Sequence, residues 1–219
     1  YMPLRSGPDR AVRQWLAAVD GASTDALIEK FTQKSLRAWQ DTHQPHRSFA
    51  VLRHPLARAH AAFCDRILLE GPRGLPEIRA NLIRVHKLKL PEHGPALEDE
   101  TTYTDQDHKR AFLGFLTFLR MNLAGQTSIR VDPSWASQLT LLQGKAQFAV
   151  PDLVLREESL IEDLEHLARQ VNVPNPPALT DTAHRWEGRL KAIYAQPLED
   201  AARAAYGRDY ATFGFANWS

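Results

Sequence analysis

The residues of this chain best suited to hold an anion follow a short apolar run. Residues 49–52, FAVL, read as a buried strand, and Arg53 comes directly after it. His54 and Pro55 then open a segment of helical periodicity, residues 55–69, and proline suits the first position of a helix. A helix N-terminus offers unpaired N–H groups and the positive end of its dipole, and a guanidinium is a planar, permanently charged fork. This order of strand, arginine and helix predicts a phosphate or sulfate site.

A second stretch near the N-terminus has the layout of a phosphate-binding loop. Residues 5–10, RSGPDR, form a polar turn before an expected helix over residues 11–19. A single glycine, Gly7, is a weak signal for such a loop. An ordinary turn with Asp9 or Ser6 as the helix cap explains these residues equally well.

The composition is that of a soluble globular protein with one domain over residues 1–219. Apolar residues make up 43% and charged residues 24% of the chain, and the net charge of +1 gives no field directed at nucleic acid or membrane. No apolar run reaches membrane-spanning length and no signal peptide is visible, so we expect a cytoplasmic protein. The chain opens at Tyr1 without an initiator methionine, which leaves room for upstream residues.

The sequence predicts no metal centre. The single cysteine, Cys64, excludes an internal disulfide framework and a multi-cysteine metal site, and it reads as a small core residue within a helix. No cluster of His, Asp and Glu has metal-ligand spacing, and no nucleophile elbow is present.

Helices dominate the expected secondary structure. Further helices are expected over residues 24–34, 36–40, 75–86, 108–123, 132–142, 160–171, 181–194 and 198–206. Strand candidates besides 49–52 are residues 1–4 and 152–156, residues 87–107 read as a mobile loop, and residues 210–218 as an aromatic tail. Short apolar strands separated by helical crossovers predict an α/β fold, with a small, mostly parallel sheet covered on both faces. Ligands of such sheets bind at the carboxyl ends of the strands, where Arg53 stands.

Four stretches, taken in order, resemble sulfotransferases that use 3′-phosphoadenosine-5′-phosphosulfate. Residues 49–58, FAVLRHPLAR, match the family's 3′-phosphate-binding pattern Phe-x-Val-x-Arg-x-Pro-x-x-Arg. Residues 132–138, DPSWASQ, resemble the His-Trp-x-x-Gln element of the carbohydrate-type and bacterial branches, with serine at the histidine position. Residues 152–163, DLVLREESLIED, look like the family's strand followed by Glu-x-Leu-x-x-Asp. Residues 206–215, YGRDYATFGF, are similar to its closing Tyr-x-x-Asp-(Tyr/Phe)-x-x-Phe-Gly-(Tyr/Phe).

The resemblance implies a three-layer α/β domain related to P-loop nucleotide kinases, in which Arg53 contacts the 3′-phosphate of the donor. The family usually has a serine on the same phosphate, and Ala61 stands at that position here. The lost hydrogen bond is worth about 1–3 kcal/mol. His60, Arg58 or a backbone N–H can compensate for it.

The same resemblance places the family's 5′-phosphosulfate loop, roughly Pro-Lys-x-Gly/Ala-x-Thr/Ser-Ser/Thr, at residues 3–10. The lysine is absent, and Asp9 adds a charge that repels sulfate. Either Arg5 or Arg10 substitutes for the lysine, or the loop lies upstream of the sequence, or it is degenerate. We favour Arg5 together with the two following backbone amides, although the proline after them removes one N–H. The residues expected to bind the donor are therefore Arg5, Ser6, Gly7, Arg10, Arg53, Arg58 and Ala61.

Sulfuryl transfer also needs a base for the acceptor, which the family supplies as histidine or glutamate. His43 and His46 lie in the loop before the Arg53 strand, and His54 stands beside Arg53. A surface role is the competing interpretation for each histidine. Glu157 ends the second strand, where a salt bridge to a core arginine is an alternative to a role as base.

These residues predict an enzyme that moves sulfate from the nucleotide donor to a hydroxyl of a carbohydrate or small metabolite. Its expected partners are that donor and the acceptor, without nucleic acid or metal. The alternative is a non-catalytic relative, a binding or interaction module that kept the fold and lost the loop. A nucleotide kinase has little support, because no Gly-Lys-Ser/Thr loop is present. The sequence does not indicate an oligomeric state.

Overall fold

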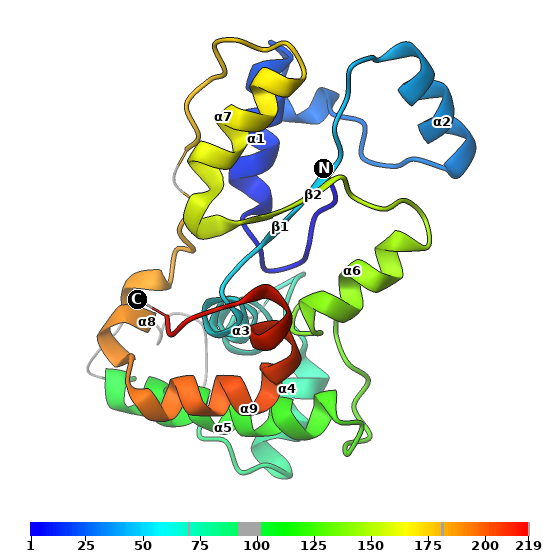
Figure 1. The fold of residues 1–219 in the computed structure, drawn as a ribbon. Helices are drawn as coiled ribbons and strands as arrows, with labels where there is room; N and C mark the ends of the chain where they lie inside the picture. Colours follow the sequence, from blue (N-terminus) through cyan, green and yellow to red (C-terminus); the bar gives the residue numbers. More distant parts are fainter. Residues whose placement is uncertain (70, 92–101, 181, 219) are drawn as a thin grey trace. The chain divides into compact units, whose positions relative to one another are not determined.

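The computed structural model describes residues 1–69, 71–91, 102–180 and 182–218, and it consists of two compact units. The first unit, called the sheet unit, comprises Tyr1–Arg53 and Leu141–Ala183. The second, called the helical unit, comprises His54–Thr140 and His184–Ser219. One boundary thus falls between the expected anion-binding arginine, Arg53, and the helix that follows it. Figure 1 shows the elements of both units coloured along the sequence.

The sheet unit is built around two parallel strands, β1 (Phe49–Leu52) and β2 (Leu153–Arg156). Phe49 pairs with Leu153 and Val51 with Leu155, so these four side chains share one face of the sheet. Helices α1 (Asp9–Val19) and α7 (Leu160–Gln170) lie side by side (Figure 1) and bury their apolar stripes against that face. The expected parallel pairing, and a small sheet with many helices, are confirmed.

Other parts of the sheet unit differ from the sequence prediction. Residues 1–4 form no regular strand, although the Met2 N–H donates to the carbonyl of Phe49 beside β1 at 2.8 Å. Instead of helices over 24–34 and 36–40, the chain forms a single 3₁₀ turn, η1 (Thr24–Ala26), and a helix, α2 (Gln33–Thr42). Thr32 and Ser35 cap α2 reciprocally, and this capping box fixes where the helix begins.

The helical unit has an apolar core of its own. Helix α3 (Pro55–Ala62) continues as a π-helical turn, η2 (Phe63–Leu68), so the expected helix over 55–69 changes its pitch half-way. Helices α5 (Asp105–Leu123) and α9 (Gln196–Phe213) pack side by side (Figure 1). The predicted inward stripe of α5 is confirmed, because its members are fully buried: Phe112, Phe115, Leu116 and Leu119.

Several boundaries in this unit correct the prediction. Helix α4 spans Pro76–Arg84 and α8 spans Glu187–Ile193, so both are shorter than expected. The expected mobile loop, residues 87–107, falls partly on residues 92–101, which lie outside the described residues, but 105–107 already belong to α5, capped by Thr104. The expected aromatic tail is also partly helical, because α9 runs to Phe213 and ends at Gly214, which has a φ of 66°.

Two further elements begin within the segments that resemble sulfotransferases, residues 132–138 and 152–163. The start of the expected helix over 132–142 is a turn, and the helix itself, α6, spans Gln138–Ala146. A 3₁₀ turn, η4 (Glu157–Ser159), connects β2 to α7. None of the helices in the described ranges is both long and apolar enough to cross a lipid bilayer.

Candidate functional site at the carboxyl edge of the sheet

Arg53 lies at the carboxyl end of β1, and only 4% of it is exposed. Its Nε and Nη2 donate to the two carboxylate oxygens of Glu157, each at 2.6 Å. Nη1 donates to the carbonyl of Ser6 at 3.3 Å, and Nη2 also donates to the carbonyl of Thr182 at 2.7 Å. The buried cation that the sequence predicted is present, and it is held by a carboxylate and two backbone carbonyls.

The pairing of Arg53 with Glu157 follows from the register of the sheet. Leu52 pairs with Arg156 at the last step of the parallel ladder, so the next residue of each strand reaches the same edge. The side chain of Glu157 is 17% exposed, and the two short N–O distances describe a bidentate, charge-assisted pair. The sequence-based interpretation of Glu157 as the partner of a core arginine is confirmed.

The turn at residues 4–8 lies at the same edge of the sheet. The Gly7 N–H donates to the carbonyl of Leu4 at 3.1 Å, and Ser6 adopts a φ of 62°. A Cβ atom on Gly7 would come within 2.9 Å of the Leu4 carbonyl oxygen and 3.9 Å of the Val51 carbonyl oxygen. Only glycine fits such a close approach of backbone to backbone. Since Arg53 donates to Ser6, the turn and the arginine form one structural group.

Asp9, in the first turn of α1, and Tyr1, the first residue of the sequence, each have a buried polar atom without a hydrogen-bond partner. These atoms are a carboxylate oxygen of Asp9, Oδ1, and the hydroxyl of Tyr1. Burial raises the pKa of Asp9, and nearby Arg13 opposes that shift. Burial also raises the pKa of Tyr1, as does the charge of Asp9. The two arginines expected here, Arg5 and Arg10, are exposed at the surface.

His43 and His46 lie near the opposite end of β1. The His43 ring stacks on Trp39 with a centroid distance of 4.4 Å, and its Nδ1 is 2.8 Å from the Trp39 carbonyl. His46 meets the same indole edge-on at 6.0 Å. Two residues later the Ser48 N–H and hydroxyl bind Asp152 at the amino end of β2, each at 2.7 Å. A four-residue strand spans about 13 Å, so the structure does not bring these histidines together with Arg53.

The remaining residues expected to contact the donor belong to the helical unit and are buried. Arg58 is 1% exposed and donates to the carbonyls of Ala136 and Pro133 at 2.7 and 2.9 Å. Ala61 is fully buried. His54 caps α3, since its Nδ1 accepts from the Leu56 N–H at 3.2 Å and its Nε2 then donates to the Ala216 carbonyl at 3.1 Å. In this unit the side chains of Arg58 and His54 therefore bind backbone groups of neighbouring segments.

Two of the stretches that suggested a family, residues 132–138 and 206–215, hold each other in the helical unit. The Asp209 carboxylate is fully buried and accepts from the Ser137 hydroxyl at 2.6 Å and from the Gln138 and Leu139 N–H groups at 2.8 and 3.1 Å. The Tyr206 hydroxyl donates to the Trp135 carbonyl at 2.8 Å. Asp209 thus caps the start of α6, a role that the sequence analysis did not assign. The sequence signal for this capping role was the aspartate within the aromatic stretch 206–215.

A comparison with protein families identifies the family of this chain. The model described as "Sulfotransferase family" matches residues 15–216. The chain belongs to the sulfotransferase family. A search of curated proteins and a search of solved structures found no match. The matched range includes Arg53, Arg58, Ala61 and both loop histidines, whereas the turn at residues 4–8 lies outside it.

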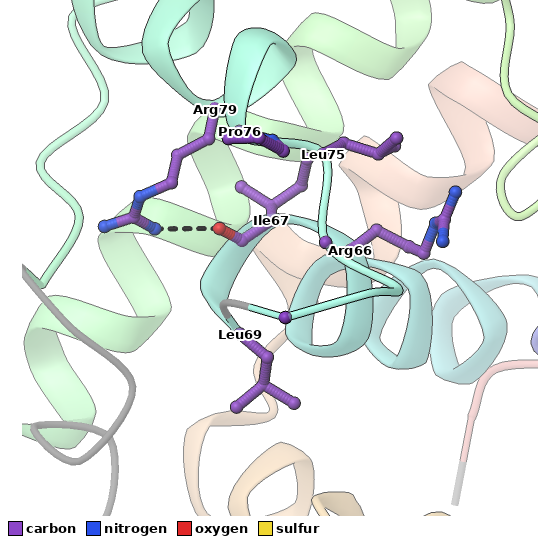
Figure 2. Close-up of a pocket in the computed structure, with 8 residues that line it drawn as sticks. Arg66, Ile67, Leu69, Leu75, Pro76 and Arg79 are labelled. Carbon is purple, nitrogen blue, oxygen red and sulfur yellow. Dashed lines mark hydrogen bonds between the residues drawn. The ribbon is translucent and has the colours of Figure 1, made fainter.

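A pocket of this sulfotransferase-family chain in the helical unit offers no comparable anion site. Its volume is about 240 Å³, and it is lined by Arg66, Ile67, Leu69, Leu75, Pro76, Arg79 and two glycines. Figure 2 shows the two arginines extending away from each other. Arg79 donates to the Ile67 carbonyl at 2.8 Å, and Arg66 contacts Asp132 at 3.3 Å. The cations at this pocket are therefore engaged by other groups of the protein.

A cluster that the sequence analysis missed lies in the helical unit. His60, Cys64 and His108 are all buried, and one potential ligand atom of each lies within 4.8 Å of the others. Burial lowers the pKa of His108 to about 3 and that of His60 well below its usual value, so both imidazoles are neutral at pH 7. The spacing of His60 and Cys64, one helical turn apart, was a visible signal for such a cluster. The third residue, His108, comes from α5, which is distant in the sequence.

Proposed function

We propose that this member of the sulfotransferase family transfers sulfate from 3′-phosphoadenosine-5′-phosphosulfate to a hydroxyl of a carbohydrate or small metabolite. The observation that carries the proposal is the carboxyl edge of the parallel β1–β2 pair. There, a tight glycine turn at the start of a helix and a buried arginine are joined through the carbonyl of Ser6. This edge is where open α/β sheets bind their ligands.

The residues at this edge fit an anionic ligand in two respects. The N-terminus of α1 points its dipole and its first N–H groups toward the turn, an arrangement that favours phosphate or sulfate. The buried Tyr1 hydroxyl and Asp9 carboxyl also lack partners, and buried polar atoms normally have one. A bound donor supplies acceptor oxygens to the Tyr1 hydroxyl.

Arg53 is the proposed contact for a donor phosphate. In the structure its guanidinium binds Glu157 and the Ser6 and Thr182 carbonyls, so a phosphate must replace part of these contacts. Glu157 retains some exposure and is the first residue of the short 3₁₀ turn η4, which makes it the partner that can move. Arg5 and Arg10 are proposed to approach the sulfate from solvent. Arg58 and Ala61 are proposed to stabilise the packing of α3 and not to contact the donor, because both side chains are buried.

The proposed reaction is an in-line displacement at sulfur. The bond between sulfur and the bridging oxygen of the 5′-phosphate breaks, a bond from sulfur to the acceptor oxygen forms, and the acceptor proton passes to a base. Cations beside the donor stabilise the charge that develops on the leaving phosphate. His43 and His46 remain the proposed bases, although they lie near the amino end of β1, away from Arg53.

A transfer assay tests the proposal. The protein is incubated with sulfur-labelled donor and a panel of sugar and small-metabolite hydroxyls, and both labelled product and 3′,5′-adenosine bisphosphate are measured. We expect labelled product with at least one acceptor, and loss of it in Arg53→Ala. A matched control, Arg169→Ala, removes an exposed arginine of α7 and is expected to retain activity. Donor binding without transfer to any acceptor would contradict the enzymatic proposal.

A further inference from the structure

The cluster of His60, Cys64 and His108 joins two elements of the helical unit. His60 lies on α3, and Cys64 follows one turn later at the start of the π-helical η2, so both side chains share a face. His108 lies in the first turns of α5. The two Nε2 atoms are 2.8 Å apart, and the Cys64 sulfur is 3.7 Å from the Nε2 of His60. Each of the three residues is 1% exposed.

Aromatic rings enclose the cluster. Phe112 meets the His60 ring edge-on at 5.0 Å, and Phe63 and Tyr103 each lie 5.6 Å from the His108 ring. Imidazole and thiol groups inside such an apolar shell are shielded from bulk water. Their polar atoms must therefore find partners within the shell.

Hydrogen bonding within the shell does not satisfy these groups. The contact between the two Nε2 atoms satisfies one nitrogen of each ring, but the Nδ1 of His108 is buried and has no partner in the structure. The Tyr103 hydroxyl, in the same shell, is also buried without a partner. A ligand held by the two Nε2 atoms leaves the His108 Nδ1 unchanged, so it is the unpartnered Tyr103 hydroxyl, in the same shell as the His–Cys–His cluster, that indicates a missing ligand.

We propose that His60, Cys64 and His108 bind one Zn²⁺ ion, which ties α3 and η2 to α5. Two imidazoles and a thiolate form a borderline-soft ligand set that suits zinc and excludes magnesium and calcium. In a tetrahedral zinc site the nitrogen and sulfur ligands stand about 3.6 Å apart and two nitrogen ligands about 3.3 Å. The observed nitrogen–sulfur distance of 3.7 Å fits, and the two Nε2 atoms need to separate by about 0.5 Å.

The charges around the cluster are compatible with a cation. Arg185 lies near Cys64 and pairs with Asp65 at 3.4 Å. Arg189 is another nearby positive group: its guanidinium carbon lies 4.9 Å from the Tyr103 ring centroid. Its Nε is 3.3 Å from a carboxylate oxygen of Asp105, which offsets that charge. The Cys64 thiolate offsets one of the two charges of the metal. The fourth coordination position is left for water or for the Tyr103 hydroxyl.

Cobalt substitution tests the proposal on the full chain. Metal-free protein, prepared with a chelator and carrying no histidine tag, is titrated with Co²⁺ while its visible and near-ultraviolet absorption is recorded. We expect tetrahedral cobalt bands and a thiolate-to-cobalt charge-transfer band, saturating at one ion per chain and bleached by one equivalent of Zn²⁺. Absence of the thiolate band in the wild-type protein overturns the proposal, and this result needs no variant.

Substitutions identify the ligands. Cys64→Ser is expected to abolish the charge-transfer band, and His108→Gln is expected to weaken Co²⁺ binding at least tenfold. His166→Gln, at an exposed position of α7, serves as the matched control and is expected to bind as the wild type does. Binding that persists unchanged in Cys64→Ser, or that is lost in a His43→Gln/His46→Gln variant, overturns the assignment. If Cys64→Ser does not fold, the wild-type spectrum decides. These readouts are independent of sulfate transfer.

Discussion

Arg53 and Glu157 form a bidentate ion pair that joins the carboxyl ends of β1 and β2. The pair explains how a nearly buried guanidinium is tolerated in the sheet unit, because an unpaired buried charge is very costly. The pair also weakens the binding of an anionic ligand at this edge, because the ligand competes with the Glu157 carboxylate for the same N–H donors of Arg53.

Removing the charge of Glu157 should strengthen donor binding and weaken the fold. Glu157→Gln keeps the shape of the side chain but removes the carboxylate charge that pairs with the nearly buried Arg53, so the free energy of unfolding is expected to fall by about 3 kcal/mol. The released guanidinium is expected to bind 3′,5′-adenosine bisphosphate several-fold more tightly. Urea denaturation and titration calorimetry measure the two effects. Weaker nucleotide binding would show that Glu157 orients Arg53 instead of competing with the ligand.

The turn at residues 4–8 should not tolerate a Cβ atom at Gly7. In Gly7→Ala the new methyl group meets the Leu4 carbonyl oxygen at 2.9 Å, so the turn must shift away from the sheet edge. We expect a loss of about 1–2 kcal/mol of stability and weaker donor binding. Gly144→Ala is the matched control, because a Cβ atom there meets nothing within 4 Å. Equal nucleotide affinity in both variants would show that the turn is not part of the donor site.

The amount of this site that the sequence predicts depends on how far apart its members lie in the chain. Arg53 and the helix after it are contiguous, so the strand-to-helix pattern located them, and the parallel register then placed Glu157 opposite. The stripe of α5 was likewise local and was predicted correctly. The beginning of α2 was missed, because the Thr32–Ser35 capping box outweighs the apolar pattern of residues 24–34.

Tertiary relationships explain the other failures. The spacing of His60 and Cys64 was visible in the sequence, but nothing local connects them to His108 on α5. The expectation that no metal is bound rested on sequence spacing alone, and the proposed zinc site departs from it. The positions of His43 and His46 relative to Arg53 depended on the direction of β1. Proximity in sequence suggested proximity in space, whereas the strand carries the two groups to opposite ends.

The two loop histidines should be dispensable for donor binding. Because they lie near the amino end of β1, the His43→Gln/His46→Gln variant is expected to bind 3′,5′-adenosine bisphosphate as the wild type does. The transfer assay then tests their proposed role as bases. Loss of transfer with intact nucleotide binding would support that role, whereas weakened nucleotide binding would contradict the placement of the donor at the carboxyl edge.

Asp152 should contribute to the dependence of stability on pH. The Ser48 N–H, followed by the Ser48 hydroxyl, holds the pKa of Asp152 below its usual value. A lowered pKa in the folded state means that the stabilisation is complete above about pH 4 and is lost as the pH falls through the folded value. Asp152 is exposed, so solvent screening limits the effect to about 1 kcal/mol or less. Urea denaturation of wild type and Asp152→Asn at pH 7 and pH 3 measures it, and an equal difference in stability at both pH values would contradict the assignment.

Binding of 3′,5′-adenosine bisphosphate, measured by isothermal titration calorimetry, tests the central claim most directly. The wild-type chain is compared with Arg53→Ala, with Arg53→Gln/Glu157→Gln, which removes both buried charges together, and with the exposed control Arg169→Ala. We predict binding by the wild type and the control, and at least tenfold weaker binding by both Arg53 variants. Absence of binding by the wild type, or equal affinity in the Arg53 variants, would contradict a donor site centred on Arg53.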